Sequence, residues 1–194
     1  MELGTEYWEN RWQKEETGWD IGYPSTPISS YFDQVSNKET RILIPGCGNG
    51  WEGEYLHNAG FTNVFLIDLS ETALNKFAAR NPTFPKDHLL VRNFFDLNET
   101  FDFVVEQTFF CAIPIMQRAA YVKKMHEVLS DNGRLVGLLF DTAFDKQGPP
   151  FGGNRAEYVN LFEQHFHIQT METAKNSIEP RAGRELFINL KPKI

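Results

Sequence analysis

The stretch Arg41-Ile42-Leu43-Ile44-Pro45-Gly46-Cys47-Gly48-Asn49-Gly50 decides the fold of this chain. An apolar run opens into a loop with glycine at every second position, and a helical pattern follows the loop. A second apolar run, from Val64 to Ile67, then ends in Asp68. This order predicts a strand–loop–helix–strand unit that places backbone N–H groups and a helix N-terminus against an extended polar ligand.

The spacing of the glycines separates two nucleoside ligands that use this layout. The dinucleotide fingerprint has its third glycine three positions after the second, beside a pyrophosphate. Trp51 occupies that position here, and the third glycine is Gly50 instead. A G-x-G-x-G loop suits S-adenosylmethionine (SAM), which has no pyrophosphate and whose methionine part passes close to the backbone. We therefore predict a SAM site at Gly46 and Gly48, with Asp68 on the ribose hydroxyls.

Length, composition and charge narrow the class of protein. A chain of 194 residues with 41% hydrophobic and 23% charged residues is typical of one soluble globular domain. A formal net charge of -7 argues against nucleic acid or an anionic membrane as the main partner. No signal-peptide pattern and no long apolar segment occurs, so we expect a cytoplasmic protein.

Strand patterns and helix patterns alternate along the chain. Strands are expected at 41–45, 63–68, 89–92, 101–105, 134–140, 167–173 and 184–190, and helices at 5–14, 28–35, 51–59, 71–80, 114–129 and 155–165. This alternation predicts an α/β fold with a mostly parallel seven-stranded sheet and helices on both faces. The last two strands have no helix between them, so a hairpin at the sheet edge should supply one antiparallel edge strand.

Ligands on such a sheet bind at the carboxyl ends of the strands. Four loops therefore converge on one site, namely those after Ile44, Ile67, Arg92 and Val105. Five segments, most of them in these loops, carry a resemblance: Trp8-Glu9-Asn10-Arg11-Trp12, Pro45-Gly46-Cys47-Gly48, Phe95-Asp96-Leu97, Thr108-Phe109-Phe110-Cys111-Ala112-Ile113-Pro114 and Gly148-Pro149-Pro150-Phe151. Together they resemble the thiopurine S-methyltransferase family, including its plant-type thiol and halide methyltransferase branch.

The resemblance implies a fold and an activity. The fold is a single Rossmann-like class I methyltransferase domain over residues 1–194, with residues 1–38 as an amino-terminal helical lid and residues 39–194 as the core. The activity is SAM-dependent methyl transfer to small thiols or hydrosulfide, or to halide and thiocyanate ions. Most methyltransferases carry an acid two residues before the first glycine. This chain has Ile44 there, as the family does, and the resemblance implies that the Gly46 carbonyl serves instead.

Several residue types suit the cofactor. Asp96 is expected to contact the adenine amino group, and strand alternation leaves Phe94 to face the ring while Phe95 enters the core. Trp8 and Trp12 lie at i and i+4, which fits either helix packing or contact with the sulfonium cation. The expected cofactor-binding residues are Trp8, Trp12, Trp19, Gly46, Gly48, Asp68, Leu69, Asn93, Phe94, Asp96 and Glu106.

The acceptor site is expected to hold aromatic residues and an arginine. The expected substrate-binding residues are Trp19, Phe109, Phe110, Arg118 and Phe151, and the resemblance places the family's pocket arginine at Arg118, the residue predicted as catalytic. The histidines show no convincing metal-ligand spacing, so no metal site is predicted. Cys111 has no nearby His or Lys to activate it and is expected to pack in the core.

Two other functions stay open from the sequence. A nicotinamide-dependent oxidoreductase would use the same strand–loop–helix unit, but Trp51 at the third glycine position argues against it. A non-catalytic SAM-binding protein would need no acceptor pocket, whereas the segments around Phe109 and Phe151 suggest one. The sequence identifies neither the methyl acceptor nor the oligomeric state.

Overall fold

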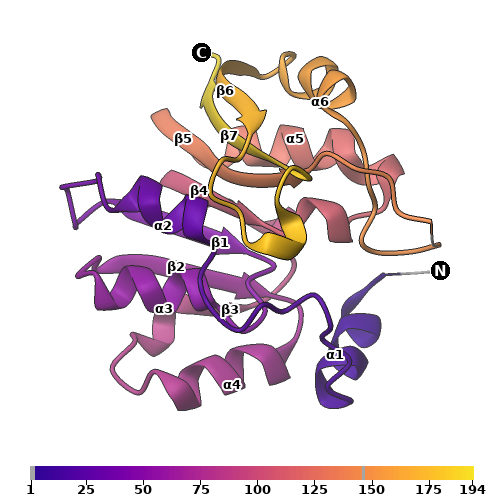
Figure 1. The fold of residues 1–194 in the computed structure, drawn as a ribbon. Coiled ribbons are helices and arrows are strands. Elements are labelled where there is room, and N and C mark those ends of the chain that lie inside the picture. Colours follow the sequence, from indigo (N-terminus) through magenta and orange to yellow (C-terminus); the bar gives the residue numbers. More distant parts are fainter. Residues whose placement is uncertain (1–2, 146) are drawn as a thin grey trace.

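The computed structural model describes residues 3–145 and 147–194, which form one sheet with helices on both faces (Figure 1). The strand order is β3-β2-β1-β4-β5-β7-β6. The strands are β1 (Arg41–Pro45), β2 (Asn63–Asp68), β3 (Leu89–Val91), β4 (Phe101–Gln107), β5 (Leu129–Phe140), β6 (Phe166–Thr173) and β7 (Glu185–Pro192). Neighbours from β3 to β5 are parallel, and β7 is antiparallel to both β5 and β6. The predicted fold is confirmed, with the antiparallel β7 one place inside the edge strand β6.

All of the described α-helices except the first divide between two hydrophobic cores, one on each face of the sheet. The α-helices are α1 (Thr5–Gln13), α2 (Thr26–Phe32), α3 (Trp51–Asn58), α4 (Glu71–Arg80), α5 (Arg118–Glu127) and α6 (Arg155–Phe162). Side chains of α5 and α6 share a core with Leu43, whereas side chains of α2, α3 and α4 share the other core with Ile42 and Ile44. Successive β1 residues therefore enter opposite cores, as the strand period of two requires.

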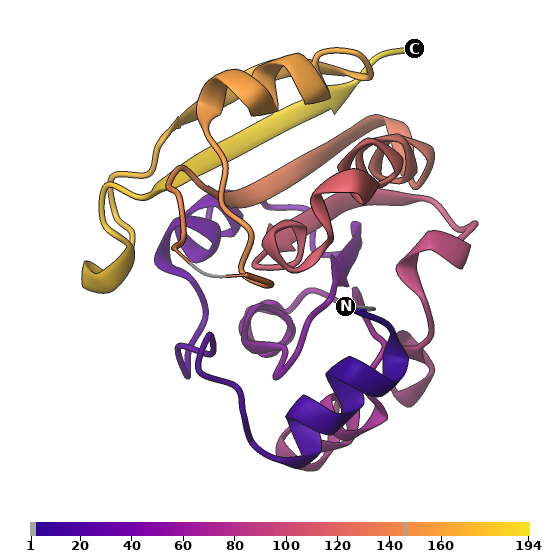
Figure 2. The same cartoon turned by 90° about the vertical axis from the view of Figure 1, so that its right-hand side faces the viewer.

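The register of the parallel strands brings their carboxyl ends together. Pro45 at the end of β1 pairs with Ile67, and Asp68 at the end of β2 pairs with Val91 at the end of β3. Figure 2 shows that α1 and the chain after it run across the side of the domain facing the viewer. Helix α1 also packs against α4. The loops after β1, β2 and β3 thus leave from one edge of the sheet.

Two element boundaries differ from the sequence-based expectation. Helix α5 begins at Arg118 and not at Pro114, because the residues between them, Ile115–Gln117, form a 3-10 turn. Strand β5 begins at Leu129 and not at residue 134. Phe101 pairs with Leu129 and Phe103 with Arg134, so a bulge accommodates the expected turn within the strand. Within the described chain, none of the helices combines the length and apolar character that crossing a membrane requires.

Candidate active site

A cavity of about 1230 Å³ opens where the loops after the strands meet. One part of its wall comes from the loops that follow β1, β2 and β3, including Gly46, Gly48, Asp68, Leu69 and Asn93. The amino-terminal segment supplies a second part, with Trp8, Arg11, Trp12, Trp19 and Asp20. The third part comes from the turn after β4, from the loop after β5 and from the connection between β6 and β7. Most of the residues predicted for the cofactor therefore face one cavity.

The glycine loop has a backbone that only glycine adopts readily. Gly46, Gly48 and Gly50 have φ values of 56°, 55° and 66°, in the left-handed region. A Cβ atom at Gly46 would lie 2.3 Å from the Phe109 ring, and one at Gly48 would lie 2.8 Å from the Trp12 ring. Both conformation and space therefore require glycine, and the loop forms a cradle with backbone N–H groups beside the N-terminus of α3.

Asp68 joins the first two loops at the end of β2. Its Oδ2 accepts a hydrogen bond from the Gly48 amide at 2.9 Å, and its Oδ1 accepts one from the Ser70 amide at 2.9 Å. Burial raises the pKa of the carboxyl, although these amide hydrogen bonds oppose the rise. Ser70 caps α4 by accepting from the Ala73 amide, as expected, so Asp68 is not the helix cap. Each carboxylate oxygen retains a lone pair for a ligand hydroxyl.

Three tryptophans of the amino-terminal segment form an aromatic wall of the cavity. Trp19 meets Trp8 edge to face at a centroid distance of 5.8 Å and Trp12 at 6.0 Å. The Arg11 guanidinium lies 5.0 Å from the centre of the Trp19 ring. All four residues line the cavity. Trp12 is 3% exposed and also lines the cavity, so it both packs in the protein interior and contacts the cavity.

Glu9 fastens α1 to the start of α4. Its carboxylate accepts hydrogen bonds from the Ser70 hydroxyl at 2.6 Å, from the Thr72 amide at 3.2 Å and from the Thr72 hydroxyl. Desolvation raises the pKa of Glu9, but the hydrogen bonds from Ser70 and Thr72 together lower it to about 2. The carboxylate is therefore charged at neutral pH, and it lies at the positive end of the α4 dipole.

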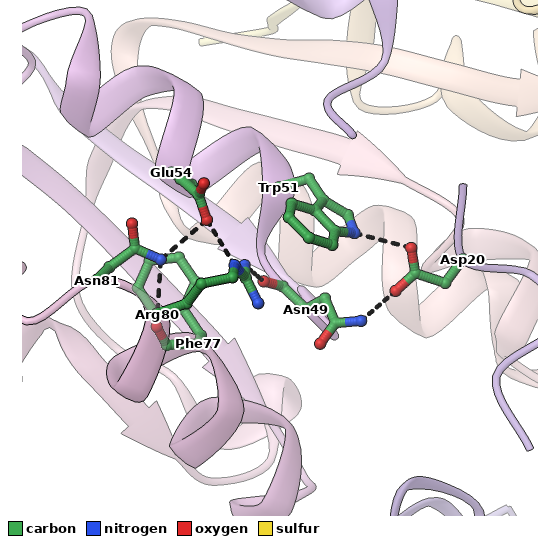
Figure 3. A network of polar contacts seen from close by, with 7 residues as sticks. All are labelled: Asp20, Asn49, Trp51, Glu54, Phe77, Arg80 and Asn81. Carbon is green, nitrogen blue, oxygen red and sulfur yellow. Dashed lines mark hydrogen bonds and ion pairs between the residues drawn. The ribbon is translucent and has the colours of Figure 1, made fainter. Parts of the chain in front are cut away.

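Asp20 fastens the same segment to the glycine loop (Figure 3). Its Oδ1 accepts from the Trp51 indole N–H at 2.7 Å, and its Oδ2 accepts from the Asn49 side-chain amide. The Arg80 guanidinium lies 4.0 Å from the Trp51 ring centre, donates to the Asn49 carbonyl at 2.6 Å and pairs with Glu54 at 2.7 Å.

The adenine-side residues are placed differently from the prediction. Residues Phe94–Asp96 form a 3-10 turn, because β3 already ends at Val91, so strand alternation does not apply to them. Both Phe94 and Phe95 line the cavity, and Phe94 also belongs to the core. Asn93 lines the cavity too and accepts a hydrogen bond from the Phe95 amide at 3.0 Å. Asp96 is exposed and lies outside the lining, so the described structure does not bring it to the site.

Only some of the site residues predicted at the end of β4 and in the turn after it line the cavity. Thr108 and Phe109 line the cavity. Glu106 and Phe110 instead line a separate void of about 10 Å³. Glu106 is fully buried and accepts hydrogen bonds from the amides of Phe109 and Phe110, so it binds the protein's own backbone. Glu106, expected to bind the cofactor, therefore does not line the large cavity.

Arg118 and Phe151 also lie outside the cavity lining. The Arg118 Nη2 donates to the carbonyl oxygens of Phe151 at 3.2 Å and Gly152 at 2.9 Å, and the guanidinium lies 4.5 Å from the Phe110 ring centre. Arg118 is the first residue of α5 and not a residue one turn inside a helix that begins at Pro114. Arg118 therefore supports the loop whose Pro149 and Pro150 reach the cavity.

The cations that do line the third part of the cavity were missed by the sequence analysis. They are Arg181 and Arg184, from the connection between β6 and β7. The Arg181 guanidinium pairs with Glu185 at 3.3 Å and donates to the Trp19 carbonyl at 2.9 Å. Its only sequence signal is two arginines in the Glu179–Arg184 stretch, far beyond the glycine loop in the sequence. No local pattern predicts that this connection folds onto the site.

Cys111 lines the cavity but is not an activated thiol. Burial raises its pKa to about 12, and its Sγ donates to the Thr108 carbonyl at 3.2 Å. The thiol is therefore protonated at neutral pH, as expected for a packing residue. No cluster of three or more His, Cys, Asp or Glu residues within 3–145 and 147–194 is arranged to hold a metal ion.

These features define a class of protein. A mostly parallel α/β sheet, a glycine cradle without the dinucleotide spacing and an acid at the end of the second strand are typical of Rossmann-like class I SAM-dependent methyltransferases. The chain belongs to the thiopurine S-methyltransferase (TPMT) family, whose sequence model matches residues 3–188. It is therefore a methyltransferase that uses SAM as the methyl donor, and a nicotinamide cofactor is no longer a candidate.

Known proteins support this assignment. The chain is 32% identical to thiocyanate methyltransferase 1 of Brassica oleracea and 29% identical to probable thiol methyltransferase 2 of Arabidopsis thaliana. Each alignment of 184 residues covers 92% of this chain and 81% of the relative. The structure resembles Burkholderia thailandensis 1,6-didemethyltoxoflavin-N1-methyltransferase with a TM-score of 0.75, covering 97% of this chain and 86% of that one. At 16% identity, this last similarity shows the fold.

Proposed function

We propose that this chain transfers the methyl group of SAM to a small thiol or hydrosulfide, or to a halide or thiocyanate ion. One observation carries the proposal: the charged groups of the cavity suit an anion and offer no free general base. Among the described lining residues, four arginines face two aspartates, Asp20 and Asp68, and histidine, lysine and glutamate do not occur. Both aspartates already accept hydrogen bonds from the glycine loop. The names of the plant relatives fit the same acceptors.

A soft anion needs little proton chemistry. When bound, SAM supplies an electrophilic methyl group on a sulfonium sulfur. The acceptor arrives as an anion, and a free thiol with a reference pKa near 8.5 is already roughly a few per cent ionised at neutral pH. The protein has to align the two reactants, exclude water and lower the cost of desolvating the anion. Arg184 supplies positive charge for that last step in a chain whose overall charge is negative, whereas the charge of Arg181 is already paired with Glu185.

The three walls divide these tasks. Gly46, Gly48 and Asp68 fit the methionine and ribose parts of SAM, and Leu69, Asn93 and Phe94 fit the base. The tryptophan wall suits a sulfonium cation, because the electron-rich face of an indole ring attracts positive charge. Residues 3–25 act as a lid over the core, held by Glu9, by Asp20 and by the Trp19 carbonyl. Helix α2 also falls within the expected lid of residues 1–38, but it packs in the core with Ile42 and Ile44 and belongs to the core. Phe109 and the β6–β7 connection form the acceptor side.

An acceptor screen tests the proposal. Purified protein and SAM are incubated with hydrosulfide, small thiols, iodide and thiocyanate, and both S-adenosylhomocysteine (SAH) and the methylated product are quantified by mass spectrometry. We expect turnover with at least one of these acceptors and none without an acceptor. Tight SAM binding in calorimetry without turnover on any acceptor would reject the proposal in favour of a non-catalytic SAM-binding protein. The Asp68→Ala variant serves as the control for contaminating activity.

A further inference from the structure

Glu106 is a buried carboxylate with an unusual set of partners. It lies next to the end of β4, is fully buried and stays outside the lining of the large cavity. Its Oε1 accepts from the amides of Phe109 and Phe110, both at 2.8 Å, and its Oε2 accepts from the Tyr121 hydroxyl of α5. All three donors fix the turn that follows β4 against α5. Because Glu106 does not line the cavity, contact with a ligand there does not explain a carboxylate at this buried position.

The turn that Glu106 holds has a strained backbone and forms part of the cavity wall. Thr108 has a φ of 57°, a region that residues other than glycine rarely adopt. Such a residue persists only where the surrounding structure holds it. The Cys111 thiol donates to the Thr108 carbonyl, and the Phe109 ring lies against Gly46 of the glycine loop. A loss of the Glu106 contacts would release this turn at the point where it meets both reactants.

We propose that Glu106, oriented by Tyr121, is a positioning residue that holds Thr108 and Phe109 in the wall of the methyl-transfer site. The inference rests on the proposed function where kcat is measured, and on SAM binding where SAH affinity is measured. Glu106 touches neither reactant in this arrangement. It acts through the two amides, which set the direction of the Phe109 ring over Gly46.

The ionisation state of Glu106 should change how tightly it holds the turn after β4. Burial raises its pKa to about 7, although the Tyr121 hydroxyl and the two amides lower it. The titratable and charged groups around it are Tyr121 and Arg118 of α5, Cys111 of the turn, and Glu185 of β7, which is paired with Arg181. The pKa of Tyr121 is raised well above its ordinary value, so Tyr121 remains a donor. Hydrogen bonds to a charged acceptor are stronger, so the ionised carboxylate holds the turn more tightly.

Substitutions at Glu106 separate positioning from bulk packing. Glu106→Gln keeps an oxygen for the two amides, whereas Glu106→Leu keeps the volume and leaves both amides without an acceptor. We expect kcat for Glu106→Gln within about three-fold of the parent protein, and a loss of ten-fold or more for Glu106→Leu. SAH affinity in calorimetry should fall about five-fold or more in the leucine variant only. Glu127→Gln, an exposed carboxylate on the same helix as Tyr121, is the matched control.

A pH profile adds a readout that simple packing would not move. The acceptor is iodide or thiocyanate, because neither ion titrates between pH 5.5 and 8.5, and SAH affinity is measured over the same range. We expect kcat/KM to rise with pH through an apparent pKa near 7 in the parent protein, and this inflection to disappear in Glu106→Gln. Tyr121→Phe removes a donor to the charged form, so the inflection should move to higher pH.

The outcomes distinguish this inference from the proposed function. If the parent protein methylates no acceptor but SAH affinity shows the pattern above, the proposed function fails and the positioning role of Glu106 is supported. If acceptors are methylated while Glu106→Leu matches the parent in kcat and SAH affinity, the positioning role of Glu106 is wrong. Identical pH profiles for the parent and Glu106→Gln would also overturn it. Should the leucine variant fail to fold, the pH shifts in Glu106→Gln and Tyr121→Phe decide the question.

Discussion

The cavity has two halves that are built in opposite ways. The cofactor half consists of loops that directly follow three adjacent parallel strands, and hydrogen bonds such as the one from the Gly48 amide to the Asp68 carboxylate fix them to one another. The acceptor half is assembled from segments far apart in the chain. The Trp19 carbonyl accepts from Arg181 across 162 positions, and Arg118 reaches Gly152 across 34.

This difference separates two kinds of constraint. The cofactor half depends on backbone conformation, because glycines at positive φ allow other side chains to approach the loop. The acceptor half depends on side-chain contacts between elements, which can change without altering the sheet. We therefore expect substitutions in the first half to impair every methyl-transfer reaction, and substitutions in the second to change the preference among acceptors.

Gly46→Ala should give the largest effect, in the cofactor half. The added Cβ would lie 2.3 Å from the Phe109 ring, at a φ of 56°. Both the strain and the displaced ring should lower kcat/KM by about a hundred-fold or more, roughly 2.7 kcal/mol. Gly60→Ala is the control, since Gly60 also has a positive φ of 88° but no atom within 4 Å of the added Cβ. Steady-state kinetics with equal losses in both variants would attribute the effect to backbone strain alone.

Asp68→Ala should come next. It strands the Gly48 and Ser70 amides and removes the acid proposed for the ribose hydroxyls. We expect SAM and SAH affinities to fall by about 1–3 kcal/mol in calorimetric titration. The loss should be the same whichever acceptor is used, because the contact lies in the cofactor half. Unchanged SAH affinity in a folded Asp68→Ala variant would remove Asp68 from the binding site.

The same division explains what could be predicted from the sequence. Gly46, Gly48 and Asp68 were found because their spacing follows from one strand–loop–helix–strand unit, in which a local pattern determines the backbone. The order of strands and helices was also correct, since each depends on the hydrophobic period of its own segment.

The errors occur where long-range packing decides the geometry. Pro114 predicts a helix start, yet the 3-10 turn Ile115–Gln117 comes first and α5 begins at Arg118, whose guanidinium donates to the Gly152 carbonyl. The split between Phe94 and Phe95 rested on strand alternation, but the segment forms a 3-10 turn and both residues line the cavity. Asp96, expected at the adenine, is exposed and lies outside the lining. Arg181 and Arg184 carry no local signal, because their place in the cavity depends on the pairing of β6 with β7 and on the contact with Trp19.

Arg184→Ala tests the acceptor half with a smaller expected effect. Arg184 lines the cavity, and its guanidinium lies 5.6 Å from the Phe144 ring centre. Removing this charge should raise KM for anionic acceptors about five- to ten-fold, on the order of 1 kcal/mol, with SAH affinity unchanged. Arg134→Ala is a suitable control, because Arg134 lies on β5 outside the cavity and donates to Asn132 and Gly133. An equal change in SAH affinity would place Arg184 in the cofactor half.

Glu9→Gln should give the smallest effect, because it weakens only one of the contacts that hold the amino-terminal lid. The glutamine keeps an oxygen for the Thr72 amide but loses the negative charge at the N-terminus of α4, which is worth about 0.3–1 kcal/mol. We expect SAH to dissociate about two- to five-fold faster in stopped-flow experiments, with the unfolding transition nearly unchanged. Glu6→Gln is the matched control, since Glu6 is exposed in the first turn of the same helix. The pKa of Glu9 is about 2, so the difference between Glu9→Gln and the parent should be constant from pH 6 to 8. A difference that disappears within this range would mean that another titrating group holds the lid, and the fastening of α1 to α4 would have to be assigned elsewhere.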